Sequence, residues 1–381
     1  APITLFDASK FRTRFACEVK NFEPTNFLDK KEARKIDRFA QFALLASDQA
    51  MADAGLNKEN VNPDRTGVVL GSGIGGLTTF QHEVMEFAKG DGTPRFNPFF
   101  IPKMILDIAA GQVSMRHNLR GPNYAVTSAC ASSTNAMIDA LNLIRLGKAD
   151  IMVTGGSEAV ISEAGIGGFN AMKAMSERND DPATASRPYD KDRDGFVIGE
   201  AAGILVLEEL EHAKARGAKI YCEVVGGGAS ADAYHITAPH PQGLGAKNVM
   251  LAALNDAGLG ITDVDYINTH GTATPLGDIA ETKAILDVFG EHAYKLNISS
   301  TKSMTGHCLG AAGVIEAIAC IKSVIHDIVP PTINHFTDDP ELDPKLNFTF
   351  NKAQNRVVNV ALSNTFGFGG HNACVIVKKY T

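Results

Sequence analysis

One cysteine and two distant histidines are the residues of this chain whose types and settings are best suited to chemistry. Cys130 lies in the run NYAVTSACASSTNAMIDAL, His270 in NTHGTATPLGD and His307 in TKSMTGHCLGAAG. A cysteine thiolate is a nucleophile that can carry an acyl group, and histidines near neutral pH can manage protons and a carboxylate. Together they are the minimum set for an enzyme that forms an acyl-thioester on itself.

The residues around Cys130 predict a junction between a strand and a helix. Residues 123–128 carry β-branched and aromatic side chains, and residues 131–145 are rich in alanine with apolar residues at helical spacing. Because free amides and the helix dipole favour an anion at such a junction, we expect the Cys130 thiolate to be favoured without a neighbouring base. The alternative is a small buried residue, the usual situation of a free cysteine.

His270 and His307 stand in similar settings. His270 follows the strand-like run DYIN and precedes a loop rich in glycine and proline, after which a helix is expected. His307 follows another predicted strand, with Lys302 five residues upstream and several small residues downstream. Each histidine alone could be a core residue, but together with Cys130 they indicate a site.

The other cysteines lie in apolar stretches without the spacing of metal ligands or of a disulfide framework. We interpret them as core residues and expect no metal, no disulfide and a reducing cytoplasm. They are Cys17, Cys222, Cys308, Cys320 and Cys374.

Several motifs in a fixed order resemble one enzyme family. SACAS, SRPYDKDRDGFVIGE, HGTATPLGD, SSTKSMTGHCLGAAG and NTFGFGG are similar to the motifs of the β-ketoacyl-acyl carrier protein synthases of fatty acid synthesis, in particular the elongating type II group. The resemblance covers the whole chain. It implies an acyltransferase with a thiolase-like α/β fold of five layers, αβαβα, that acts on acyl carrier protein as a homodimer. It implies no cofactor beyond the phosphopantetheine arm of the carrier.

The resemblance also implies roles for the reactive residues. Cys130 would carry the acyl group, and its own amide with that of Phe368 would hold the oxyanion. His270 and His307 would donate hydrogen bonds from Nε2 during condensation with a malonyl group. Lys302 would be catalytic, although a structural ion pair with Glu316 is an open alternative.

Further residues would surround the substrate. Phe368 would gate the acyl pocket, and the glycines beside it would allow an unusual backbone path. Thr272 and Thr274 would bind the phosphopantetheine arm, with loop capping as the alternative. The remaining predicted substrate-binding residues are Phe366, for which a core position is the simpler interpretation, Gly367, Gly369, and Asp232 in a second mobile loop.

An internal repeat predicts two duplicated α/β halves, residues 1–217 and 218–381. The segment Ala16–Val19 matches Tyr221–Val224, and DAGL recurs at 53–56 and 256–259, each copy followed by a strand. The second half has a strand before its YCEV copy, so we expect a further strand before Ala1 in the natural chain. Intact-mass measurement tests that expectation.

Composition excludes two broad classes. The net charge of −7 argues against a nucleic-acid binder, and no apolar run reaches transmembrane length. Locally, Lys31, Arg34, Lys35 and Arg38 fall near one face of a predicted helix. This basic patch is either solvated surface or a docking site for an acidic carrier protein.

Related enzymes are weighed by single residues. A degradative thiolase would use a second cysteine near the C-terminus as a base, but Cys374 enters a strand. An initiating type III synthase would carry Asn in place of His307, and a noncatalytic chain-length factor would lack Cys130. A polyketide ketosynthase shares every catalytic residue and stays open. Ala201 and His371 depart from the family pattern, and the sequence assigns no role to His371.

Overall fold

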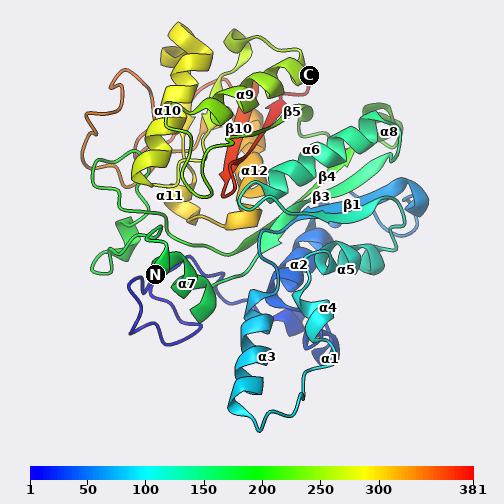
Figure 1. Cartoon of the computed structure of the whole chain (residues 1–381). Coiled ribbons are helices and arrows are strands. Elements are labelled where there is room, and N and C mark those ends of the chain that lie inside the picture. Colours follow the sequence, from blue (N-terminus) through cyan, green and yellow to red (C-terminus); the bar gives the residue numbers. More distant parts are fainter.

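Parallel strands near the middle of the chain build the first sheet. The computed structural model describes all 381 residues (Figure 1). The sheet contains β1 (Thr66–Gly71), β2 (Asn123–Val126), β3 (Ile151–Glu158) and β4 (Ala201–Glu208) in the order β2-β1-β3-β4. β1 is parallel to β2 and β3, and β4 is antiparallel to β3. β1 and β3 are buried throughout, as strands covered on both faces must be.

The second sheet repeats this arrangement with one more strand. It contains β5 (Glu223–Ala231), β6 (Tyr266–Asn268), β7 (Asn297–Ser299), β10 (Val360–Gly367) and β11 (His371–Lys378) in the order β5-β11-β10-β6-β7. β6 is parallel to β7 and β10, while β11 is antiparallel to β10 and to β5. Strands β6, β7, β10 and β11 therefore correspond to β1, β2, β3 and β4.

Helices complete the predicted five layers. α6 (Ser132–Arg145) and α12 (Ala312–His326) lie between the two sheets, as Figure 1 shows. α2 (Arg38–Asp53) and α5 (Ile108–His117) cover the outer face of the first sheet. α9 (Leu244–Ala257) covers the outer face of the second, with α10 (Pro275–Phe289) packed beside it. The order αβαβα is that of the thiolase-like fold, so the predicted fold class is confirmed.

Shorter elements connect these layers. The helices are α1 (Lys30–Ala33), α3 (Leu77–Lys89), α4 (Phe100–Met104), α7 (Glu163–Ala171), α8 (Leu210–Ala215) and α11 (Lys302–Thr305). β8 (Ile328–Val329) and β9 (Gln354–Asn355) form a separate two-stranded ribbon. Of the six 3-10 turns, Leu309–Ala311 leads directly into α12.

α12 is apolar on most of its circumference because both sheets pack against it. The segment Leu309–His326 has the length and hydropathy of a membrane span by composition, but 61% of it is buried inside the protein. The expectation that no apolar run reaches that length was therefore wrong. Burial between two sheets explains the composition of this segment.

The structure confirms one part of the predicted repeat and corrects another. After each DAGL copy, a 3-10 turn leads into a strand, β1 in the first half and β6 in the second. The match of Ala16–Val19 with Tyr221–Val224 was wrong, because Cys17 makes only an isolated bridge to Gly199, whereas β5 begins at Glu223. β4 has no neighbour where its counterpart β11 pairs with β5. The further strand before Ala1 stays a prediction.

Candidate active site

Cys130 lies on a tight turn between β2 and α6, as the sequence predicts. The preceding residue, Ala129, has a φ of +50°, a conformation that alanine rarely adopts. The Ser132 side chain braces this turn, accepting from the Ser128 amide at 2.9 Å and donating to the Ala129 carbonyl at 2.6 Å. The turn holds the buried Cys130 sulfur toward the second half of the chain.

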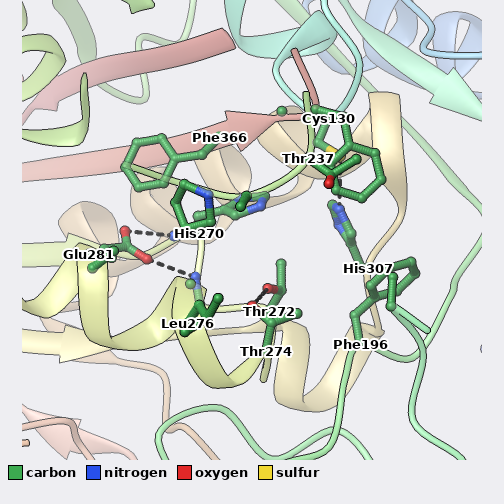
Figure 2. A pocket seen from close by; sticks show the side chains of 18 of the residues that line it. Cys130, Phe196, Thr237, His270, Thr272, Thr274, Leu276, Glu281, His307 and Phe366 are labelled. Atoms are coloured by element: carbon green, nitrogen blue, oxygen red, sulfur yellow. Dashed lines mark hydrogen bonds between the residues drawn. The ribbon is translucent and has the colours of Figure 1, made fainter. Parts of the chain in front are cut away.

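His307 is the immediate partner of this sulfur. Its Nε2 lies 3.0 Å from the Cys130 Sγ, and Figure 2 shows the ring pointing at the thiol. Burial raises the pKa of Cys130 to about 12, against the charge of Lys302 and a hydrogen bond from the Phe368 amide. The expectation that the helix terminus activates this thiol without a base was therefore wrong. In this closed pocket the resting thiol is neutral and His307 is placed to take its proton.

The two histidines form a pair. Their rings meet edge to face with centroids 5.2 Å apart. Burial lowers the pKa of both His270 and His307 well below the ordinary value, and the Lys302 charge lowers both further. Nδ1 of each ring is buried without a hydrogen-bond partner. Both rings are thus neutral, and the protein fixes neither tautomer.

Lys302 forms the ion pair with Glu316 that the sequence left open as the alternative to a catalytic role. Its ammonium group forms a buried ion pair with Glu316 on α12, and Lys302 does not line the pocket. Burial raises the pKa of Glu316 to about 7, and the Lys302 charge opposes that shift. Lys302 therefore acts on the site through its charge, which lowers the pKa of Cys130 and of both histidines.

The turn between β10 and β11 approaches the sulfur from the other side. The Phe368 amide donates toward Cys130, and the Phe368 ring lies 6.4 Å from that of Phe169. An added Cβ on Gly367 would lie 2.7 Å from the Ser128 carbonyl oxygen, so only glycine fits against the nucleophile turn. Gly369 has a φ of +89°. The two amides predicted for an oxyanion site, those of Cys130 and Phe368, lie on these two facing turns.

The Asp232 loop is tied to this turn. The Asp232 amide donates to the Gly370 carbonyl at 2.9 Å, and the Gly369 amide donates to the Ile236 carbonyl at 2.7 Å. The Asp232 carboxylate accepts from Asn372 Nδ2 at 2.9 Å. Movement of one loop therefore requires movement of the other.

A cavity of about 400 Å³ joins these parts. The predicted residues that line it are Cys130, Asp232, His270, Thr272, Thr274, His307, Phe366, Gly367 and Phe368, while Gly369 does not. Thr272 and Thr274 face each other with their hydroxyl oxygens 3.1 Å apart. Thr274 precedes α10 without making a side-chain cap, so capping is not its role. The Phe366 ring packs 5.6 Å from His270, at the pocket wall (Figure 2).

The sequence did not predict the role of two carboxylates on α10, Glu281 and Asp278. Glu281 on α10 accepts from the amides of His270 and Gly271, both at 2.9 Å, and so holds the His270 loop (Figure 2). Burial raises the pKa of Glu281 to about 7, although the two amides favour its ionised form. Asp278, one helical turn earlier, accepts from the Tyr189 amide at 2.9 Å. The sequence could have indicated them, because Asp278 and Glu281 are three residues apart and therefore lie on one face of the helix that follows the HGT motif.

The basic patch differs from the expected helical face. α1 ends at Ala33 and α2 begins at Arg38, because Asp37 caps α2. Lys31, Arg34 and Lys35 are exposed around the break, and Lys35 lies 5.2 Å from the Phe99 ring. Arg38 turns away and pairs with the buried Glu200. Three residues of the proposed patch are therefore free to meet a partner, and Arg38 is not.

Cys374 is buried in β11, paired with Asn364 across the strands, so it cannot serve as the second cysteine of a thiolase. His371 is exposed and begins the same strand, with its ring folded against Gly369. All six cysteines are free thiols. Cys308 and Cys320 are buried, whereas Cys17 and Cys222 are half-buried.

Known enzymes are similar in sequence to this chain over nearly its whole length. A 3-oxoacyl-[acyl-carrier-protein] synthase 2 of Synechocystis is 51% identical, with 100% of this chain and 90% of the relative covered. The enzyme of the same name from Staphylococcus aureus is 50% identical over 99% of this chain and 90% of its own length.

Solved structures agree. A beta-ketoacyl synthase from Burkholderia phymatum is 35% identical with a TM-score of 0.91, covering 98% of this chain and 91% of its own. The ishigamide ketosynthase/chain length factor is 34% identical with a TM-score of 0.92, covering 100% and 92%.

Two family models match most of the chain. The beta-ketoacyl synthase N-terminal domain matches residues 5–213, and the C-terminal domain matches residues 221–336. The predicted family and the acyltransferase class of elongating condensing enzymes are confirmed. The chain belongs to the beta-ketoacyl synthase family.

Proposed function

We propose that this chain extends carrier-bound acyl groups by two carbons, using Cys130 as the acyl carrier and His270 with His307 for condensation. The observation that supports it most is the cross-half contact of 3.0 Å between Cys130 Sγ and His307 Nε2. The nucleophile comes from residues 1–217 and the histidines from 218–381. We treat these two halves as one catalytic unit, because neither contains a complete site.

In the first step, the Cys130 sulfur attacks the carbonyl carbon of an acyl thioester held by acyl carrier protein. His307 takes the thiol proton and returns it to the departing phosphopantetheine sulfur, so the transfer is balanced. The tetrahedral oxyanion lies between the amides of Cys130 and Phe368. Phe368 must move to admit the acyl chain, and the bonds from its turn to the Asp232 loop mean that this loop moves too.

In the second step, a malonyl thioester loses carbon dioxide, and the electron pair of the broken bond forms an enolate. The enolate carbon attacks the acyl-Cys130 carbonyl and breaks the bond to sulfur, giving a β-ketoacyl product two carbons longer. Cys130 leaves as a thiolate and takes up one proton from solvent, which restores the resting thiol. Once Cys130 is acylated it offers no proton, so a neutral His307 presents an N–H to the enolate oxygen alongside His270. The unfixed tautomers allow His307 to accept in one step and donate in the other.

The carrier protein is the proposed partner, and its phosphopantetheine arm is the only prosthetic group required. Thr272 and Thr274 stand in the pocket wall where an extended arm would pass. A solved relative, 32% identical with a TM-score of 0.91, is described as a type II polyketide synthase acyl-carrier protein in complex with its ketosynthase. We propose that the exposed Lys31, Arg34 and Lys35 attract the acidic carrier.

We also propose that the enzyme is a cytoplasmic homodimer. Six free cysteines suit a reducing compartment. α3, α4 and the loop between them carry an exposed apolar surface, which a second copy of the chain would cover. Its members are Phe80, Val84, Met85, Phe87, Phe96, Phe99 and Ile101. Sedimentation equilibrium tests this, and the mass of a single chain at micromolar concentration would contradict it.

The activity is tested by supplying acyl carrier thioesters of graded length with malonyl carrier protein. We expect one product two carbons longer than each accepted substrate, and an acyl adduct on the Cys130 peptide by mass spectrometry. Cys130→Ala should abolish both. Full condensing activity in that variant would refute the mechanism, and acylation without condensation would indicate a transferase.

A polyketide ketosynthase is the second candidate, because one solved relative is described as the ketosynthase of a type II polyketide synthase and another as a ketosynthase/chain length factor. The curated relatives at 50–51% identity favour the fatty acid enzyme. Excess malonyl carrier protein without any reductase separates the two. A fatty acid enzyme stops after one extension, whereas repeated extension to a poly-β-keto chain would favour the polyketide function.

A further inference from the structure

Glu158 is a buried carboxylate that the two-step scheme does not use. It ends β3, close behind the nucleophile turn, and is fully buried. It forms no salt bridge, although a buried carboxylate without a cation is costly. Burial raises the pKa of Glu158, and the surrounding backbone amides oppose that shift.

Five hydrogen bonds compensate this burial. Oε2 accepts from the amides of Gly73 at 2.7 Å and Gly310 at 3.1 Å. Oε1 accepts from the amides of Ile74 at 3.2 Å and Gly75 at 3.1 Å, and from the Ser72 hydroxyl at 3.1 Å. Three successive amides converging on one anion form a concave backbone site. The fourth amide, from Gly310, comes from the other half of the protein.

The bonded segments carry the reacting groups. An added Cβ on Gly73 would lie 3.3 Å from the Ala129 carbonyl oxygen, so this loop supports the turn that presents Cys130. Gly310 lies three residues after His307, and an added Cβ on it would lie 2.2 Å from the Gly73 nitrogen. The two halves therefore touch through bare backbone at this point, and Glu158 binds both sides.

The two segments that Glu158 bonds each lie next to a residue with a positive φ, a conformation that is uncommon for residues other than glycine. Ala129 has a φ of +50° and Leu309 a φ of +46°. Such conformations cost about 1–3 kcal/mol and persist only where their surroundings hold them. Through its hydrogen bonds to Gly73 and Gly310, Glu158 joins the loop that supports the Ala129 turn to the segment that follows Leu309.

We propose that Glu158 is a positioning residue that fixes the distance between Cys130 and His307 by tying residues 72–75 to Gly310 across the two halves. The inference rests on the proposed function. Direct activation of the thiol is not its role, because the negative charge of Glu158 raises the pKa of Cys130. Positioning and charge therefore make opposite predictions for a neutral variant.

Glu158→Gln keeps the size of the side chain but removes the charge and replaces an acceptor with an N–H group that faces amide donors. We expect kcat for condensation to fall by about tenfold to 100-fold, with little change in KM, because small misplacement of reacting groups is costly. The pH midpoint for alkylation of Cys130 by iodoacetamide should move down, since the nearby anion is gone. A kcat for condensation equal to or above that of the wild type would overturn the proposal.

Asp190→Asn is the matched control. Asp190 is also buried and accepts from three backbone amides, those of Asp192, Phe336 and Thr337. We expect it to lower the melting temperature as Glu158→Gln does while leaving kcat and the alkylation midpoint unchanged. If both variants lose kcat in proportion to melting temperature, Glu158 is only structural. Alkylation of Cys130 can be measured without condensation. If the wild-type enzyme did not condense substrates at all, that result would contradict the proposed function rather than the role of Glu158.

Ser72→Ala provides the same test if Glu158→Gln does not fold. It removes only the hydroxyl that donates to Oε1. We expect a fall in kcat of about twofold to fivefold, smaller than that of Glu158→Gln because the four amide hydrogen bonds to Glu158 remain and the misplacement of the reacting groups is smaller. A kcat equal to that of the wild type would overturn the proposal.

Discussion

The junctions at Cys130 and Lys302 occupy equivalent places in the two halves and perform different work. Each follows the strand at one edge of its sheet, β2 or β7; Cys130 lies just before α6, and Lys302 is the first residue of the short helix α11. Cys130 faces the cavity and meets His307, whereas Lys302 points into the protein and pairs with Glu316. The same backbone unit thus presents a nucleophile in one half and a fixed charge in the other. Its position alone does not make a residue reactive; contact with the cavity does.

The two histidines offer the strongest test of this division. Of the two histidines, only His307 forms a hydrogen bond with the Cys130 sulfur, so His307→Ala should slow acyl transfer and condensation alike, each by at least about 100-fold. His270→Ala should slow condensation by a similar factor while acyl transfer stays within about fivefold of the wild type. Single-turnover acylation of the Cys130 peptide, followed by mass, separates the steps. Equal loss of acyl transfer in both variants would contradict the asymmetry.

Lys302 is tested by removing it alone and then with its partner. Lys302→Met leaves Glu316 buried and unpaired, which should cost about 3–5 kcal/mol of stability and slow acylation. The double variant Lys302→Met/Glu316→Gln should recover most of the stability but only part of the rate, because the Lys302 charge that lowers the pKa of Cys130 stays absent. The loss of Glu316, which raises that pKa by a smaller effect, offsets only part of this change. Urea unfolding and acylation rates are the measurements. Recovery of both would leave Lys302 a purely structural role.

The neutral histidines also make stability depend on pH. Their folded-state pKa lies below the unfolded value of about 6.5, so the unfolded chain binds more protons below that pH. Their contribution is complete above about pH 6.5 and is lost as the pH falls toward the folded-state pKa. Between pH 7.5 and 5.5, we expect wild type to lose stability more steeply than His270→Gln/His307→Gln.

The expected difference in slope is up to about 1.4 kcal/mol per pH unit for each histidine. Glu281 and Glu316 act in the opposite sense, because a raised pKa stabilises the fold as the pH falls from about 7. They are present in both proteins, so the comparison largely removes them. Parallel stability curves from urea unfolding would show that the histidines are not buried as neutral groups.

The smallest effect is expected at the basic patch. Arg34→Glu/Lys35→Glu should raise KM for carrier-bound substrates by about threefold to tenfold at low salt, while KM for a small acyl thioester is unchanged. Lys148→Glu is the control, because Lys148 is exposed after the far end of α6. Equal effects on carrier-bound and small substrates would exclude docking.

The sequence predicts those features that depend on local pattern. The junction at Cys130 and the strands that precede both histidines follow from short motifs and from the DAGL repeat, whereas the five layers follow from the resemblance to the family. The prediction of one continuous basic helix was wrong, because Asp37 caps the N-terminus of α2, which begins at Arg38. The prediction that the helix terminus alone favours the Cys130 thiolate was wrong. Burial raises the pKa of this thiol, and the extent of that burial depends on residues from the second half of the chain.

Contacts between distant residues account for what the sequence could not predict. The donors to Glu158 lie 83 to 86 residues away in loop 72–75 and 152 residues away at Gly310. The sequence leaves the role of Lys302 open, because a catalytic lysine and an ion pair with Glu316 require the same residues. Only the packed halves show that the lysine faces away from the cavity.

The central claim is that acyl transfer needs Cys130 together with His307, whereas malonyl decarboxylation needs the histidines but not the Cys130 thiol. Cys130→Gln tests it most directly, because the variant removes the nucleophile and leaves His270, His307 and the oxyanion amides in place. Carbon dioxide release from malonyl carrier protein should continue while condensation falls to background. Loss of decarboxylation in step with condensation, in a folded variant, would contradict this claim.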